Sequence, residues 1–269
     1  MIGGLPIEFF HLPKNKEIMQ RKEKQAISLA ANSRIIIGII LLLLLVQIGF
    51  HKTYISHFPG FEDYNTPSGR RFHFSWVKHF HGMMMMGWIL MLLLQPVLIL
   101  KGKINWHHFV GSLSYVLAPL VLLSLWLITQ ERYYDILGRE GYTAAVGHLS
   151  LNFPNIVFFA LLYSLAIYYR KRSALHIPFM CGTGILLIGP ALARILILYF
   201  GLPFDNSVII SKLVMVAIPA VISIAESIRK KRISPFTVVL AVMVVNALLW
   251  ISRNTLFWQT IGGAIAKIM

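Results

Sequence analysis

Long apolar segments, separated by short stretches that hold most of the charge, constrain this chain more than any other feature. A membrane-spanning α-helix needs about 20 predominantly apolar residues. Segments of roughly that length cover residues 33–50, 76–100, 109–130, 148–169, 176–200, 208–228 and 235–252. Only 13% of the residues are charged, against about 25% in a typical soluble domain. We therefore expect an all-α, polytopic membrane helix bundle with about seven transmembrane helices.

The distribution of basic residues predicts the orientation of the bundle. Lys and Arg concentrate in cytoplasmic loops, and here the N-terminal segment 1–32 and every second loop after it are basic. Residues 33–253 then form one transmembrane domain, and the short apolar tail 254–269 lies at the outer interface. We expect a multi-pass protein of the bacterial inner membrane, with the N-terminus in the cytoplasm and the C-terminus outside. The net charge of +15 sits in the loop clusters, so the expected partner is the lipid bilayer, not nucleic acid.

Histidines at the beginnings of four consecutive predicted helices are the main indication of function. An ionisable side chain within a span is costly to place in lipid and usually faces the bundle interior. The predicted topology sorts these histidines into two layers: an outer one with His79, His81 and His148, and an inner one with His107, His108 and His176. Helices two and four would supply the outer layer, and helices three and five the inner one. Facing helices of a bundle often supply cofactor ligands in this way.

Helical phase separates only some of the neighbouring histidines. His79 and His81 point about 200° apart on a helix, so they are not expected to share one partner. His107 shares its face with Gly111 and Ser114, whereas His108 shares its face with Gly111 and Tyr115, so the choice between them stays open.

Other polar residues inside the spans carry further expectations. His148, Asn152 and Asn155 recur at i, i+4 and i+7, and this polar stripe should face the bundle interior. Arg194 is expected either to bind a haem propionate or an acidic substrate group, or to extend to the outer headgroups. Lys212, in the first turn of the sixth span, is expected to extend to the headgroups.

Three short segments of spans two and three resemble a group of uncharacterised bacterial multispan membrane proteins. These segments are His79-Phe80-His81-Gly82-Met83, Gln95-Pro96 and His107-His108-Phe109-Val110-Gly111. More distantly, the layout is similar to the ascorbate-dependent transmembrane ferrireductases, which are two-haem cytochromes b. The chain departs from that family in its seventh span, its tandem histidines and the lack of a clear ascorbate-binding cluster.

The resemblance to the two-haem cytochromes b implies a set of ligands. In that family, helices two and four hold one haem and helices three and five hold the other. The resemblance therefore implies His81 with His148 at the outer haem. At the inner haem it implies His107 or His108 with His176.

The leading hypothesis is a membrane-embedded haem b protein that moves electrons across or at the bilayer, as a transmembrane oxidoreductase would. A quinol or another small molecule would be the electron donor or acceptor. The alternative is a zinc or iron enzyme that acts on a lipid or another small molecule, with metal ligands among His81, His148 and His107. A third hypothesis is a transporter or sensor without metal, which uses Arg194 and the stripe on the fourth helix to bind a small polar ligand.

Overall fold

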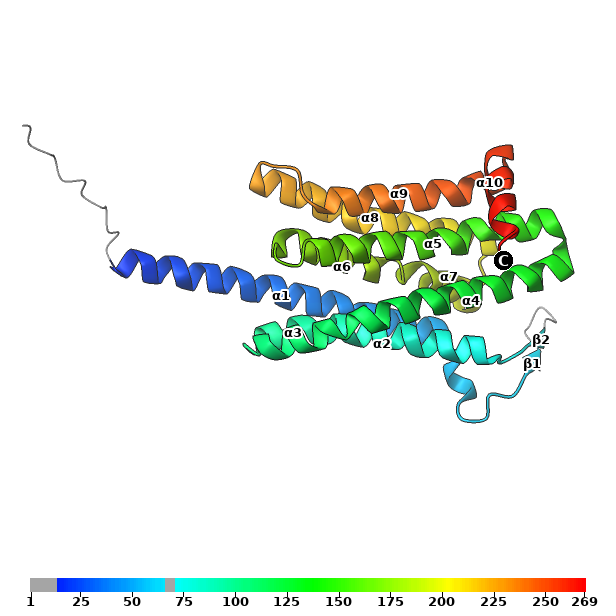
Figure 1. Cartoon of the computed structure of the whole chain (residues 1–269), viewed down its shortest axis with the longest axis horizontal. Coiled ribbons are helices and arrows are strands. Elements are labelled where there is room, and N and C mark those ends of the chain that lie inside the picture. The colour runs from blue at the N-terminus through cyan, green and yellow to red at the C-terminus, as the bar shows by residue number, and fades with distance from the viewer. Residues whose placement is uncertain (1–13, 66–70) are drawn as a thin grey trace, which may run out of the picture.

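The computed structural model describes residues 14–65 and 71–269, with side chains from residue 33 onward. This part of the chain is helical except for one small hairpin and short connections (Figure 1). The elements are α1 (Lys14–His51), η1 (Ile55–His57), β1 (Tyr64–Asn65), β2 (Arg71–Phe72), α2 (Trp76–Leu100), α3 (Ile104–Ser112), α4 (Ser114–Glu140), α5 (Tyr142–Tyr168), α6 (Ser173–Ile185), α7 (Ile188–Phe200), α8 (Phe204–Lys230), α9 (Phe236–Ile251), η2 (Ser252–Asn254) and α10 (Leu256–Ala266).

Seven helical stretches of the described chain are long and apolar enough to cross a membrane. They are Ser33–His51, Trp76–Leu100, Ile104–Glu140, Tyr142–Tyr168, Ser173–Phe200, Phe204–Lys230 and Phe236–Asn254. Large apolar side chains are exposed on their outward faces; on α1, for example, Ile37, Leu41 and Leu44 are exposed. This is expected for a surface solvated by lipid. The chain is a multi-pass membrane protein, and the predicted all-α bundle is confirmed.

The connections alternate between the two ends of the bundle (Figure 1). One end holds the turns α2–α3, α5–α6 and α8–α9, with basic clusters at 170–172 and 229–232, and we call it the basic end. The other end holds the hairpin β1–β2, the turns α4–α5 and α7–α8, and helix α10, and we call it the loop end. Helix α10 packs against α5 there.

Two spans are broken inside the bundle. The third consists of α3 and α4, and the fifth of α6 and α7. In the fifth, Pro190 in the first turn of α7 has no N–H to continue the backbone hydrogen bonding of α6. In the third, the Ser114 hydroxyl donates to the Gly111 carbonyl at 2.6 Å and competes with the helical backbone. The sequence indicated both spans but neither break.

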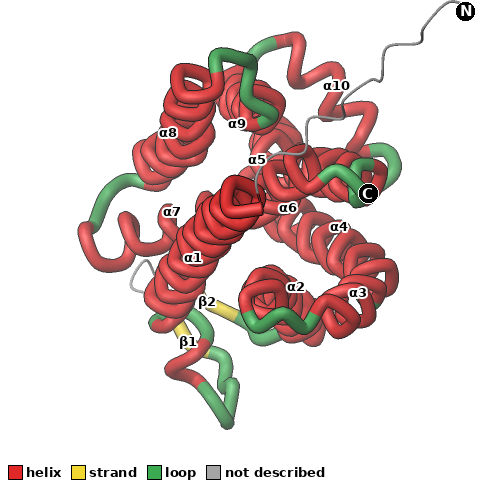
Figure 2. Tube along the Cα trace, turned by 90° about the vertical axis from the view of Figure 1, so that its left-hand side faces the viewer, coloured by secondary structure: helices red, strands yellow, loops and turns green. Residues whose placement is uncertain are grey.

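Helix α6 lies among the other helices and contacts α1, α2, α5, α7 and α9 (Figure 2). Its packing is close, because a Cβ at Gly182 would meet Leu162 of α5 at 3.1 Å and Val239 of α9 at 3.2 Å. Beside it, the buried ring of Trp88 on α2 packs edge-to-face on Phe159 of α5, with ring centroids 4.9 Å apart. These contacts make the apolar core that positions α5 and α9.

Asp63 holds the hairpin between α1 and α2. Its carboxylate accepts hydrogen bonds from the ring of His73 at 2.9 Å and from the backbone N–H of Phe74 at 3.1 Å, with Arg71 at 3.3 Å. These hydrogen bonds, with the charges of His73 and Arg71, hold the pKa of Asp63 below its ordinary value. Phe74 packs edge-on against Tyr54, so the hairpin lies over the start of α2.

Candidate functional site

A chain of buried polar side chains connects α8, α9 and α5. The ammonium of Lys212 on α8 donates to Oδ1 of Asn246 on α9. Asn246 in turn donates from Nδ2 to Oδ1 of Asn155 on α5, at 2.9 Å. The amide of Asn155 donates to the Leu151 carbonyl at 3.0 Å. Lys212 is only 5% exposed and Asn246 is fully buried, so this polar chain lies within the bundle.

The positive charge of Lys212 has no acidic partner within the described part of the chain. Asp205, on the same helix, forms an ion pair with Arg253 at 2.8 Å instead. A buried ammonium is costly without a compensating negative charge, and such residues in membrane helices commonly mark substrate or ion pathways. The prediction that Lys212 extends to the headgroups is wrong, because it lies on the buried face of α8 with Val208 and Met215.

A pocket of about 450 Å³ opens at the loop end, between the α4–α5 turn, the start of α8 and the end of α9. Arg253 stacks over the Trp250 indole, 4.2 Å from the ring centroid, and its ion pair with Asp205 connects η2 to α8. The His148 ring faces Phe204 and Trp250, with centroids 5.4 and 6.1 Å away. The lining residues are Glu140, Ala144, Gly147, His148, Pro203, Phe204, Asp205, Trp250, Arg253 and Asn254.

The pocket and the polar chain are built on the same three helices. His148 and Asn155 lie about two turns apart on α5, and Asp205 and Lys212 lie about two turns apart on α8. Trp250 lies about one turn beyond the asparagine of α9. It is 1% exposed, and its indole N–H has no hydrogen-bond partner among the described residues. A buried donor without an acceptor costs roughly 1–3 kcal/mol, and Trp250 also lines the pocket.

The predicted polar stripe on the fourth span is confirmed in part. His148 and Asn155 face α8 and α9 within the bundle, and Asn152 is half-buried.

His81 is held by α4. Its Nδ1 lies 3.2 Å from the Ser124 hydroxyl. That hydroxyl donates its proton to the Val121 carbonyl at 2.8 Å, so the imidazole donates to Ser124 and carries its proton on Nδ1. His148 contacts Phe204 of α8 and Trp250 of α9 instead, so the two histidines have different neighbours, and their pairing at one haem stays a prediction.

His79, in the first turn of α2, contacts the loop residues at that end of the bundle. It forms a hydrogen bond with the Tyr54 hydroxyl and packs against Phe61 and Phe74, with ring centroids 4.6 and 6.1 Å away. Burial raises the pKa of the Tyr54 phenol, which is therefore protonated at neutral pH. Among the side chains described, those of residues 33–65 and 71–269, no group of three His, Cys, Asp or Glu is arranged to hold a metal ion.

The three histidines of the predicted inner layer lie near one another at the basic end. The rings of His107 and His108 are 5.4 Å apart, and His107 is close enough to His176 to interact with it electrostatically. Nδ1 of His176 lies 2.8 Å from the Ala166 carbonyl. A carbonyl only accepts, so His176 carries its proton on Nδ1 and leaves Nε2 unprotonated.

Gln95 distinguishes His107 from His108. In the amide orientation that satisfies both neighbours, its oxygen accepts from the Gly111 N–H at 3.1 Å. Its nitrogen donates to the carbonyl of His107 at 3.2 Å and to the Nδ1 of the same residue. An accepting Nδ1 places the ring proton of the neutral imidazole on Nε2. The His108 side chain is exposed.

Arg194 packs against α1. Its Nη1 donates to the Pro190 carbonyl at 2.9 Å, and its guanidinium stacks over Phe50, 4.3 Å from the ring centroid. It is close enough to His81 and Tyr64 to interact with both electrostatically. Burial raises the pKa of the Tyr64 phenol, and the Arg194 charge acts in the opposite direction. Arg194 does not line the loop-end pocket.

No family model, curated protein or solved structure matches this chain. The resemblances inferred from its sequence segments therefore stay predictions. The class that fold and site define is a multi-pass helical membrane protein with a buried basic polar chain beneath a pocket at its loop end.

Proposed function

We propose that this membrane protein binds a small anionic solute between α5, α8 and α9 and moves it across the bilayer. The observation that carries the proposal is Lys212, a buried ammonium whose hydrogen-bond partner is the neutral amide of Asn246. A carboxylate or another small anion would supply the missing negative charge. The same ligand would accept from the indole N–H of Trp250.

The pocket supports an entry route from the loop end. Trp250 and Arg253 both line it, and the Arg253 guanidinium stacks on the Trp250 ring. A solute that displaces the Arg253–Asp205 ion pair would reach the indole N–H and then the ammonium of Lys212. His148, which lines the pocket, is a proton donor or acceptor on this route.

We also propose that the basic end faces the cytoplasm of a bacterial cell, so that the solute enters from outside. The basic clusters at 170–172 and 229–232 and the basic N-terminal segment support this orientation. A tag at the C-terminus should then react with an impermeant reagent in intact cells. Reaction only after the cells are permeabilised would reverse the orientation.

Ligand-dependent stability tests the binding site. The purified protein in detergent is heated with acetate, lactate, succinate or inorganic phosphate, and stabilisation by at least one of them is expected because a ligand of the native state raises its stability. Lys212→Met should weaken that binding roughly tenfold to a hundredfold, since hydrogen bonds to charged groups contribute about 1.5–3 kcal/mol.

Lys101→Met is the matched control, because it removes an exposed lysine at the basic end. It should leave the stabilisation unchanged. Equal stabilisation of wild type and Lys212→Met by every anion would contradict a binding role for the buried ammonium.

Haem b at the basic end is a second candidate, and the ring of His176 favours it. Its Nδ1 donates to the Ala166 carbonyl, which is the usual arrangement of a metal-ligating histidine. With Nε2 of His107 protonated, His108 is the better second ligand. Two imidazoles would leave the iron without an open position and suit electron transfer to a quinol or another small molecule. A reduced-minus-oxidised spectrum tests this candidate. A haem b signal that His176→Ala removes would support it. The lack of any haem b signal in folded protein, produced with haem supplied, would exclude it.

A further inference from the structure

A groove of about 790 Å³ lies at the basic end, where α5 ends and turns into α6. It is lined by Tyr163, Ser164, Ile167, Tyr168, Tyr169, Arg170, Lys171 and Arg172. Three consecutive residues of this lining are basic and none is acidic. The groove is therefore a positively charged concavity at one boundary of the membrane-spanning region.

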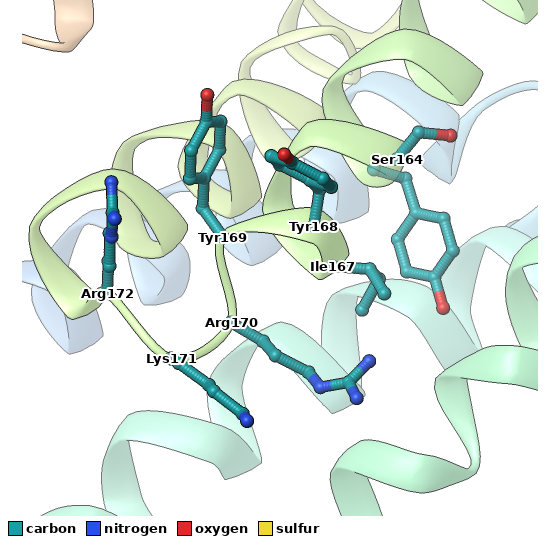
Figure 3. A pocket seen from close by; sticks show the side chains of 8 residues that line it. Ser164, Ile167, Tyr168, Tyr169, Arg170, Lys171 and Arg172 are labelled. Atoms are coloured by element: carbon teal, nitrogen blue, oxygen red, sulfur yellow. The ribbon is translucent and has the colours of Figure 1, made fainter.

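The basic side chains do not all point the same way (Figure 3). Arg170 and Lys171 extend to one side of the turn, whereas Arg172 extends to the other side with the Tyr169 ring. All three basic side chains are exposed. An anionic group that enters beside Arg170 and Lys171 therefore meets two cations on the same side.

Tyrosine and serine hydroxyl groups form hydrogen bonds beside these cations. Arg170 donates from Nη1 to the Tyr115 hydroxyl of α4 at 3.3 Å, and the Tyr163 hydroxyl lies 3.0 Å from the Ser114 hydroxyl. The contact with Tyr115 orients the guanidinium, whose other N–H groups have the fork geometry that binds two oxygens of a phosphate.

The surroundings of the groove distinguish a lipid from a soluble anion. Tyr168, which lines it, is 80% exposed, and Val116 and Tyr115 on neighbouring α4 are 65% and 48% exposed. These side chains lie exposed on the outer surface of predicted membrane spans, the surface that faces acyl chains in a bilayer. Tyrosine at such a boundary is typical of the headgroup level. A ligand that fits both the basic groove and the apolar surface beside it has an anionic head and apolar tails.

We propose that this groove is a binding site for an anionic phospholipid. The phosphate diester binds Arg170 and Lys171, Arg172 adds to the local positive charge, and the acyl chains lie along α4 and α5. Basic pockets between transmembrane helices recognise lipid headgroups by this chemistry. The site is separate from the pocket between α5, α8 and α9, so this proposal and the proposed solute site are independent.

Native mass spectrometry of the full-length protein in detergent tests the lipid site, with phosphatidylglycerol or phosphatidylcholine added. Wild type should retain phosphatidylglycerol in preference to phosphatidylcholine. The triple variant R170Q/K171Q/R172Q should lose roughly tenfold or more of its phosphatidylglycerol affinity, because each basic residue near an anionic lipid contributes roughly fivefold.

The matched control is R229Q/K231Q/R232Q, which removes the same charge from the other basic turn and keeps the Lys230–Glu226 ion pair. It should bind phosphatidylglycerol as wild type does. Equal losses in both triple variants would show attraction by overall charge and overturn the proposal.

Two further arms complete the test. If R170Q/K171Q/R172Q does not fold, Arg170→Lys is the second variant, because it keeps the charge but removes the forked guanidinium. It should still weaken phosphatidylglycerol binding, and unchanged binding in that variant would overturn the proposal.

Inorganic phosphate or glycerol phosphate, added as a competitor, should not displace the lipid. Displacement by either would identify a site for soluble phosphate instead.

Discussion

Trp88 and Trp250 are both fully buried, but the surroundings of their indole N–H groups differ. In the core between α2, α5 and α6, Trp88 donates to the Thr183 hydroxyl at 3.1 Å and packs against Phe159. In the pocket between α5, α8 and α9, the N–H of Trp250 has no partner among the described residues. Both rings are buried in the same bundle, so burial alone does not explain why only the Trp250 N–H lacks a partner.

The other polar groups of the two regions differ in the same way, in whether the protein itself supplies suitable partners. Around α2 and α4, His81 donates to Ser124, which donates to a backbone carbonyl. Between α5, α8 and α9, the ammonium of Lys212 is bound to a neutral amide. The first region satisfies its polar groups internally, as a structural core does. The second leaves a charge and a donor without such partners among the described residues, and these are the groups to which our proposal assigns a ligand.

The largest effect is expected from Asn246→Leu, because this change leaves the buried ammonium without its partner. We expect a loss of about 3 kcal/mol in the free energy of unfolding, the scale for an uncompensated charge within a membrane helix. Reversible unfolding in mixed detergent micelles measures it.

A double mutant separates that charge effect from lost packing. Lys212→Met with Asn246→Leu should recover most of the loss, because the unpaired charge is then gone. A loss in the double variant equal to the sum of the two single losses would contradict the role given to the charge.

A smaller effect should separate the two tryptophans. Trp88→Phe and Trp250→Phe remove the same ring volume, but only the first removes a hydrogen bond. Trp88→Phe should therefore cost about 1 kcal/mol more in unfolding free energy, measured in the same micelles. Equal costs, or a larger cost for Trp250→Phe, would show that the comparison between the two regions is wrong.

The smallest effect is expected in the hairpin, which lies outside both regions. Asp63 has a depressed pKa in the folded protein, so it stabilises the hairpin above its unfolded pKa of about 3.9. That stabilisation is lost as the pH falls through the lower folded-state pKa. Hydrogen exchange at the Phe74 amide, corrected for the intrinsic rate, should therefore be slow at neutral pH and accelerate below about pH 4.

Asp63→Asn is the control for the hairpin. It should show weaker protection of the Phe74 amide already at neutral pH, while stabilisation by anions stays at the wild-type level. Unchanged protection in this variant would contradict the role of the carboxylate.

The spans could be predicted from sequence because bilayer thickness fixes their length and lipid fixes their composition. The rotation of each helix could not, as Lys212 shows. Its place near a helix end favoured the headgroups, yet Ser207, Ser211 and Ser223 share its buried face. Recurring small polar residues were a signal that this face packs against protein rather than lipid.

The histidines show the same limit. Their layers follow from helix ends, and the basic-end group does gather. The neighbours of His81 on α4 and of His148 on α8 and α9 depend on how each helix is rotated, and the helix ends alone do not give that rotation. Two members of the predicted stripe, His148 and Asn155, do face the interior, because the spacing along one helix defines the stripe. Their partners on α8 and α9 come from far along the chain.

Transport through the proposed site gives the most direct test of the account. Proteoliposomes that contain wild type, Lys212→Met or Lys101→Met are given the radiolabelled form of whichever tested anion stabilises the protein most. Wild type and Lys101→Met should accumulate the anion, and Lys212→Met should stay at the level of protein-free vesicles. Uptake by folded Lys212→Met at the wild-type rate would contradict the central role of the buried ammonium.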